Sequence, residues 1–289
     1  MLTARELRQL DRLALAAPNA PPAAGTRHAR THGHGLEFRD YRRYQPGDDP
    51  RMIDWTVEAR LKQLVVRTFR AEGRLQVHLV VDTSASMGIG SPSKLTCAAR
   101  IGAALAYVAA ERRDALGVTT FDAAIRHHVP AANGRPPLMR ATRLLQSVEA
   151  SGPSDLDDAL TAFASAARGA SVAIVMSDFF DTAHRFEGLD LLRHRGVLPA
   201  LVQVVADGDV DPDVVELTEL VDAEHPERPP LLADETVVRA YHGRVSAITT
   251  GLRDYCFAHK LPWIHVRSSA SFDDIVQACV SARLLAVYS

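Results

Sequence analysis

The chain has 289 residues, of which 47% are hydrophobic, 24% charged and 6% aromatic, which fits a soluble globular protein with one main domain and an appendage. No apolar run approaches the roughly 20 residues that span a bilayer, and charges throughout the N-terminal stretch argue against a signal peptide. The three cysteines, Cys97, Cys256 and Cys279, are isolated and lack any C-x-x-C spacing. We therefore expect a cytoplasmic protein without a membrane span.

The net charge of −2 is unevenly distributed. Residues 1–75 hold 14 Lys and Arg against 9 Asp and Glu, whereas the remainder holds 19 against 26. The excess of basic residues in this N-terminal part raises nucleic-acid binding as an alternative function. However, its arginines are interleaved with acids and form no known recognition module, so we expect no nucleic-acid partner.

The N-terminal segment, residues 1–34, is predicted to be a helix followed by a basic linker. Thr3 and Glu6 have capping-box spacing, and the leucines that follow recur near the helical period, which predicts a helix over residues 3–16. After Pro18 the chain is rich in proline, glycine, arginine and histidine without an apolar period, as in a linker.

The next segment, residues 35–74, is dense in aromatic residues and in charges of both signs. Pro46-Gly47 favours a turn, and "LVVRTF" predicts a strand. Alternating charges and rings favour internal pairing that holds an irregular extension against the sheet of the main domain. The alternative is a docking face for a partner, in which Trp55 would be a contact.

Residues 75–289 alternate between apolar strands and helices. The predicted strands are residues 75–82, 115–121, 125–129, 171–178, 198–205 and 263–266. The predicted helices are residues 93–112, 136–149, one after "SGPSD", 184–194, 237–259 and 271–285. Such alternation indicates an α/β fold with a doubly wound, mostly parallel sheet that is covered on both faces. The acidic, proline-containing residues 207–236 are expected to form a surface loop or small hairpin.

Candidate metal ligands follow two of these strands. "HLVVDTSAS" places Asp82, Ser84 and Ser86 after the first strand, and "AIVMSDFFD" places Asp178 after a later one. Ser154 stands at the start of a helix between them. Because ligands bind beyond the carboxyl ends of strands in such sheets, we expect these five side chains to converge. An all-oxygen set of two carboxylates and three hydroxyls suits Mg²⁺ or Mn²⁺.

The set resembles the metal-ion-dependent adhesion site of von Willebrand factor type A domains, with Ser154 where threonine is usual. In addition, "GLEFRDYRRYQPGDDPRMIDWTVEAR" is similar to the hallmark of the bacterial domain-of-unknown-function 58 family, which joins this segment to a von Willebrand-like domain. That resemblance implies a non-enzymatic, metal-dependent interaction module. It also implies a MoxR-type AAA+ ATPase as partner, in chaperone-like assembly of other proteins.

Two alternatives to a metal-binding interaction site remain. Asp and Ser are common helix caps, so the site residues could serve only local structure. A Mg²⁺-dependent phosphohydrolase of haloacid-dehalogenase type would use Asp82 as nucleophile together with Asp178 or Asp181. However, Ser84 stands where such enzymes carry the general acid, which disfavours that activity.

Overall fold

The computed structural model divides into two compact units, residues 25–74 and residues 1–24 joined with 75–289. It describes residues 2–16, 36–45, 53–71, 75–167, 171–181, 186–210, 219–232 and 234–287. The predicted basic linker lies outside the described residues.

The smaller unit is an antiparallel β-hairpin with one short helix. Strand β2 (Leu36–Arg43) pairs with β3 (Val65–Ala71), with an irregularity between Phe38 and Asp40. Helix α2 (Trp55–Leu61) lies in the connection between the two strands. The predicted strand at "LVVRTF" is therefore present, whereas its partner β2 was not predicted.

Asp54 organises the start of α2. One carboxylate oxygen accepts hydrogen bonds from the backbone N–H groups of Thr56 and Val57, as helix N-caps do. The other oxygen accepts a hydrogen bond of 3.0 Å from the Tyr41 hydroxyl of β2. The sequence predicted side-chain pairing within this segment, and the Tyr41–Asp54 hydrogen bond is such a contact. Trp55, in contrast, is 60% exposed.

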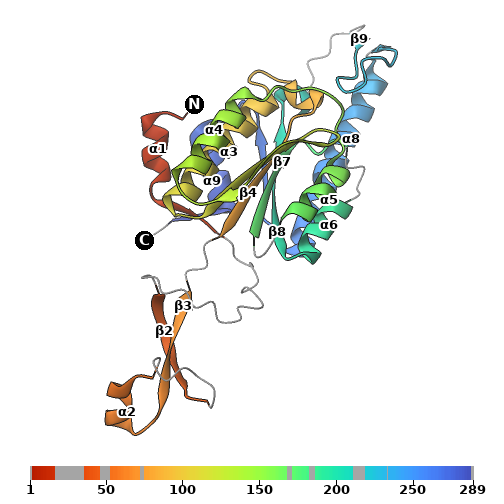
Figure 1. Ribbon diagram of the computed structural model, residues 1–289. Coiled ribbons are helices and arrows are strands. Elements are labelled where there is room, and N and C mark those ends of the chain that lie inside the picture. The colour runs from red at the N-terminus through yellow and green to blue at the C-terminus, as the bar shows by residue number, and fades with distance from the viewer. Residues whose placement is uncertain are drawn as a thin grey trace. The chain divides into compact units, whose positions relative to one another are not determined.

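A six-stranded sheet forms the centre of the larger unit (Figure 1). Its spatial order is β11 (Trp263–Arg267), β8 (Val197–Val205), β7 (Ser171–Ser177), β4 (Gln76–Asp82), β5 (Ala115–Phe121) and β6 (Ile125–Ala132). All neighbours are parallel except β5 and β6. A mixed α/β fold around a mostly parallel sheet is therefore confirmed.

Helices pack on both faces of this sheet (Figure 1). One face carries α3 (Lys94–Glu111), α4 (Arg135–Ser147) and α9 (Phe272–Ser281), with α1 (Ala4–Leu10) against α3. The other carries α5 (Leu156–Ala166), α6 (Glu187–His194) and α8 (Glu235–His259). Val77, Leu79 and Val81 of β4 join the first core and Val80 joins the second, as alternation along a doubly buried strand requires.

The two ends of the larger unit differ from the prediction. The predicted helix 3–16 stops at Leu10, and strand β1 (Leu13–Leu15) pairs antiparallel with β12 (Leu285–Val287). The predicted helix 271–285 likewise ends at Ser281. Both predictions were too long because pairing between residues more than 260 positions apart replaces helical bonds at both ends.

The strand order creates a switch point beside β4. From β4 the chain proceeds to β5 and β6 on one side, then returns to β7 on the other side of β4 and continues to β8 and β11. The carboxyl ends of β4 and β7 therefore lie next to each other, where α/β sheets commonly bind ligands.

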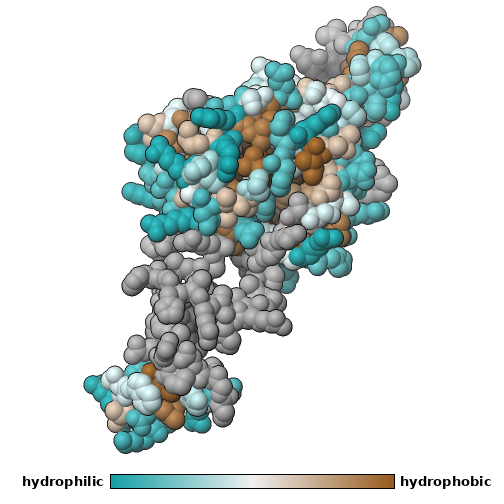
Figure 2. Space-filling view, viewed as in Figure 1, coloured by the Kyte–Doolittle hydropathy of each residue, from teal (hydrophilic) through white to brown (hydrophobic). Residues whose placement is uncertain are grey.

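Among the described residues, no helix is both long enough and apolar enough to cross a bilayer. Figure 2 shows the apolar side chains on this face of the larger unit as small areas separated by polar ones.

Candidate functional site

Asp82 is the last residue of β4, and its side chain is fully buried. Oδ1 accepts a hydrogen bond of 2.8 Å from the backbone N–H of Ser84, which turns the chain into the short helix η2 (Ala85–Gly88). The hydroxyl oxygens of Ser84 and Ser86 are 3.1 Å apart. The D-x-S-x-S stretch thus places one carboxylate and two hydroxyls in one buried turn.

The loop before α5 is docked onto this turn through its backbone. The N–H of Ser151 donates to the carbonyl of Thr83, and the N–H of Ala85 donates to the carbonyl of Gly152, both at 2.8 Å. These bonds bring the hydroxyl oxygen of Ser154 to 3.4 Å from Asp82 Oδ2, which shares the one hydroxyl proton with Asp181 Oδ2. The predicted meeting of Ser154 with Asp82 is therefore present.

The end of β7 provides a further contact that the sequence did not predict. Ser177 Oγ donates a 2.6 Å hydrogen bond to Asp82 Oδ2 and accepts one of 2.9 Å from the N–H of Phe179. Phe179 has a left-handed backbone with φ of 62°, which is rare for a bulky residue. Its hydrogen bond to Ser177 supports this turn, which directs the chain after Asp178.

Asp178, the fifth predicted ligand, is buried near enough to Asp82 for their charges to interact, but it makes no direct hydrogen bond to the other four among the contacts described. Its Oδ1 accepts the N–H of Phe180 at 3.1 Å, and its Oδ2 accepts the ammonium of Lys94 at 2.6 Å. The structure therefore brings Asp82, Ser84, Ser86 and Ser154 into one hydrogen-bonded set. Asp178 joins them as a neighbouring negative charge.

Burial and mutual repulsion dominate the electrostatics of these carboxyl groups. Burial, together with the charge of Asp178, raises the pKa of Asp82 to about 7. The carboxyl group of Asp181 behaves similarly, because burial and the charges of Asp178 and Glu224 raise its pKa to about 6. The site thus disfavours its own negative charges unless a cation or a proton accompanies them.

Asp181 and Glu224 lie on the other side of Ser154. Asp181 Oδ2 accepts hydrogen bonds from the Ser154 hydroxyl at 3.2 Å and from the N–H of Leu156 at 2.8 Å. Glu224 accepts the N–H of Ser154 at 3.1 Å. Sequence reasoning considered Asp181 only for a phosphohydrolase and did not consider Glu224, since nothing in the pattern links a residue 70 positions away to Ser154.

Lys94 is the other residue that the sequence did not single out. It opens α3, is fully buried, and contacts Asp178 at 2.6 Å and Asp209 Oδ2 at 3.1 Å. Asp209 belongs to α7 (Asp207–Val210) and is only 3% exposed. The prediction that residues 207–236 form only a surface loop or hairpin is therefore wrong at Asp209, although β9 (Glu219–Leu220) and β10 (Leu231–Leu232) do form a small hairpin.

The candidate ligands are carboxylate and hydroxyl oxygens, the type of donor that hard divalent cations prefer. Among the described residues, the only cationic side chain hydrogen-bonded to Asp82, Asp178 or Asp181 is Lys94, and Asp181 Oδ1 is buried without a hydrogen-bond donor. Within the same described ranges, no cluster of three or more His, Cys, Asp or Glu side chains has metal-binding geometry. An ion here would therefore depend on serine hydroxyls as well as carboxylates.

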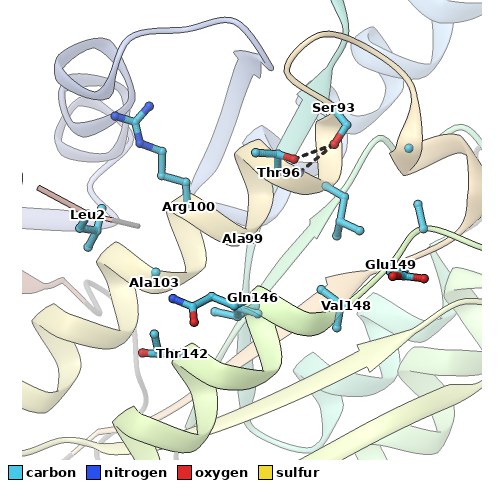
Figure 3. A pocket seen from close by; sticks show the side chains of 14 residues that line it. Leu2, Ser93, Thr96, Ala99, Arg100, Ala103, Thr142, Gln146, Val148 and Glu149 are labelled. Atoms are coloured by element: carbon cyan, nitrogen blue, oxygen red, sulfur yellow. Dashed lines mark hydrogen bonds between the residues drawn. The ribbon is translucent and has the colours of Figure 1, made fainter.

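A separate pocket lies between α3 and α4 (Figure 3). It has a volume of about 480 Å³, and its lining includes Leu2, Ala99, Arg100, Thr142 and Gln146. Figure 3 shows Ser93 and Thr96 at the end of this groove nearest the start of α3. None of the five predicted ligands lines it.

Comparison with known proteins identifies a family. The model of a family described as "Protein of unknown function DUF58" matches residues 40–247. Uncharacterized proteins from Mycobacterium tuberculosis (strain H37Rv) and Mycobacterium bovis are each 31% identical over 195 residues, which cover 66% of this chain. The same match covers 60% of the length of those relatives.

Solved structures with a remote likeness include membrane-related proteins. The conserved hypothetical protein BatB from Bacteroides thetaiotaomicron is 17% identical, with a TM-score of 0.45 over 72% of this chain and 98% of that one. An aerotolerance-related membrane protein from Bacteroides fragilis is 15% identical, with a TM-score of 0.44 over the same shares.

The expected cytoplasmic location is corrected by this finding. It was inferred from the lack of a spanning segment in the chain, yet one of these proteins is described as a membrane protein. The lack of a spanning helix in the described residues therefore does not place the chain in the cytoplasm.

Proposed function

Because this chain belongs to the DUF58 family of proteins of unknown function, we propose that it is a non-enzymatic, metal-dependent protein-interaction module. In this proposal the larger unit is a doubly wound domain of von Willebrand factor type A kind. A Mg²⁺ or Mn²⁺ ion lies among Asp82, Ser84, Ser86, Ser154 and Asp178, and the binding partner supplies a further oxygen.

One observation carries the proposal. Asp82 is fully buried at the carboxyl end of the central strand and is surrounded by the hydroxyls of Ser84, Ser154 and Ser177, beside a second buried carboxylate. A hydroxyl that donates to a carboxylate can rotate and offer its lone pairs to a cation instead. The arrangement therefore suits an ion that replaces the proton favoured by the raised pKa of Asp82.

The chemistry of the ligands points to an acidic partner. Because Lys94 already pairs with Asp178, Asp82 and the three neutral hydroxyls leave a divalent charge only partly compensated. A carboxylate from another protein would therefore complete the shell favourably. We propose that this carboxylate belongs to a MoxR-type AAA+ ATPase, on the basis of the resemblance in the segment at residues 35–72.

Capture of the ATPase by the immobilised full chain tests this proposal. Capture should require Mg²⁺ or Mn²⁺, weaken on addition of a chelator, and weaken equally in Asp82→Ala. Asp114→Ala is a matched control, since Asp114 is a buried carboxylate that accepts the N–H of Leu75 before β4, away from the site. Capture that neither the chelator nor Asp82→Ala alters would contradict a metal-mediated contact.

The phosphohydrolase alternative has weaker support. A nucleophilic carboxylate must be reachable by its substrate, whereas Asp82 is fully buried and hydrogen-bonded on both oxygens. Turnover of phosphoesters with Mg²⁺ that is abolished in Asp82→Asn would favour the enzyme over the interaction module.

A further inference from the structure

A fully buried lysine lies against the candidate metal site. The Lys94 ammonium is 2.6 Å from Asp178 Oδ2 and 3.1 Å from Asp209 Oδ2, and it lies 4.7 Å from the ring centroid of Phe180. Asp209 is itself held by the N–H of Ala206 at 2.8 Å and by the hydroxyl of Tyr241 at 3.0 Å. Lys94 thus joins the site to a second buried carboxylate that is fixed from two sides.

These contacts keep Lys94 charged. Two carboxylates within 3.1 Å offset the cost of burying the charged ammonium group. An ammonium group has no lone pair and cannot bind a metal ion. A divalent ion that approached Asp178 would therefore be repelled by the Lys94 ammonium, which is already bound to the carboxylate.

Asp82 is held differently. Its Oδ2 accepts hydrogen bonds from the hydroxyls of Ser177 and Ser154, which are neutral and can rotate. An ion can therefore approach Asp82 without displacing a cation, whereas direct contact with Asp178 Oδ2 requires Lys94 to withdraw toward Asp209.

We propose that Lys94 is the resident counter-cation of this site, which competes with the divalent ion for Asp178 and keeps that carboxylate out of direct contact with the ion. In this arrangement Asp178 interacts with the ion through a bridging water or through its charge. The contact of Lys94 with Asp209 determines how firmly Lys94 binds Asp178. This inference rests on the proposed metal-binding function and names the residue that tunes it.

Two variants of the full chain should shift affinity in opposite directions when titrated calorimetrically with Mn²⁺ alone. Lys94→Met frees two carboxylates and should tighten Mn²⁺ binding roughly tenfold or more, since a unit charge at this range is weakly screened. Asp209→Asn removes one of the two carboxylates that pair with Lys94. Lys94 should then bind Asp178 more firmly, which should weaken Mn²⁺ binding. In Asp209→Asn the amide oxygen can still accept from the N–H of Ala206, and the amide N–H can donate to the hydroxyl oxygen of Tyr241. Asp114→Asn is the control without effect.

The outcomes separate this inference from the proposed function. Opposite shifts support it, and if Lys94→Met does not fold, weaker binding in Asp209→Asn decides in its favour. Wild-type binding that neither folded variant alters overturns the role of Lys94 and leaves the metal site standing. Mn²⁺ binding that appears only in Lys94→Met supports the role of Lys94 as counter-cation but overturns a metal-dependent function of the native chain. No Mn²⁺ binding in the wild type or in any variant overturns both the role of Lys94 and the proposed function.

Discussion

Ser177 shows how much one hydroxyl can do in the interior of the sheet. It donates to the Asp82 carboxylate at 2.6 Å and accepts the N–H of Phe179 at 2.9 Å, so it joins the ends of β4 and β7. Asp82 and Phe179 are both fully buried. Removal of the Ser177 hydroxyl would therefore take one hydrogen bond from each of them.

We therefore expect Ser177→Ala to lower the free energy of unfolding by about 1–3 kcal/mol, because two buried groups each lose a hydrogen bond. Chemical denaturation without divalent ions measures this loss. Ser165→Ala is the control, because its exposed hydroxyl donates to the carbonyl of Thr161 within the same helix and the change should stay within about 0.5 kcal/mol. Equal stability of the two variants would show that Ser177 does not hold Asp82 in place.

Among individual residues, the sequence predicted the D-x-S-x-S motif but not the residues that contact its carboxylates. Asp82, Ser84 and Ser86 are recognisable because they are close in the chain and follow an apolar strand. Lys94 and Ser177 resemble an ordinary helix start and a strand residue, and only the fold brings them to carboxylates 84 and 95 positions away.

The loop that carries Ser154 depends on a glycine. Gly152 has φ of 76°, and a Cβ there would lie 3.1 Å from Asp122 Oδ2. This carboxylate also pairs with Arg126. The loop therefore needs both the left-handed backbone and the small side chain to place its carbonyl on the turn after Asp82.

Gly152→Ala should destabilise the protein by about 1–2 kcal/mol through the left-handed backbone alone and further through the contact with Asp122. It should also weaken Mn²⁺ binding, because Ser154 follows two residues later. Gly196→Ala is a close control: Gly196 has the same φ of 76°, but a Cβ there meets nothing within 4 Å. If the two variants lose equal stability and bind Mn²⁺ equally, the loop does not position Ser154 as described.

Strand β4 carries a buried histidine besides its apolar residues. His78 packs edge-on against Phe163 of α5, and the space beside its ring exists because residue 117 on β5 is glycine. Among the described residues, neither ring nitrogen has a hydrogen-bond partner. Burial, assisted by His128 of β6, lowers the pKa of His78 from 6.5 to about 4.

Acid should therefore destabilise the fold through His78. Between pH 6.5 and 4 the unfolded chain binds a proton that the folded His78 does not, so the free energy of unfolding falls as the pH falls, by up to about 3 kcal/mol. Denaturation of wild type and His78→Phe at pH 7 and pH 4.5 isolates this contribution, since the variant should lose less stability in acid. Identical losses would show that His78 is not buried as a neutral ring.

Local patterns predicted the long elements better than the short ones. Helix α3 has 18 residues and strand β4 is a nearly continuous apolar run, so both are recognisable in the sequence. In contrast, β1 and β12 have three residues each and are stable only as a pair. No local signal distinguishes such a strand from the end of a helix, which is why both terminal helices were predicted too long.

In the larger unit as a whole, the strand order determines where the site can lie. Apolar strands alternating with helices predicted a parallel sheet, but not that β7 would lie beside β4 rather than beside β6. That adjacency places Asp178 near Asp82, and it arises from packing on both faces of the sheet rather than from any local motif.

The central claim is that one divalent ion lies among oxygens from three distant segments. Crystals of the full chain soaked in Mn²⁺ and measured at the manganese absorption edge test it most directly. We predict one anomalous peak within about 2.1 Å of an oxygen of Asp82 and of the hydroxyls of Ser84, Ser86 and Ser154, with the carboxylate of Asp178 next to it without direct contact. Saturating Mn²⁺ that leaves this position without a peak, or a peak bound only by other residues, would contradict the claim.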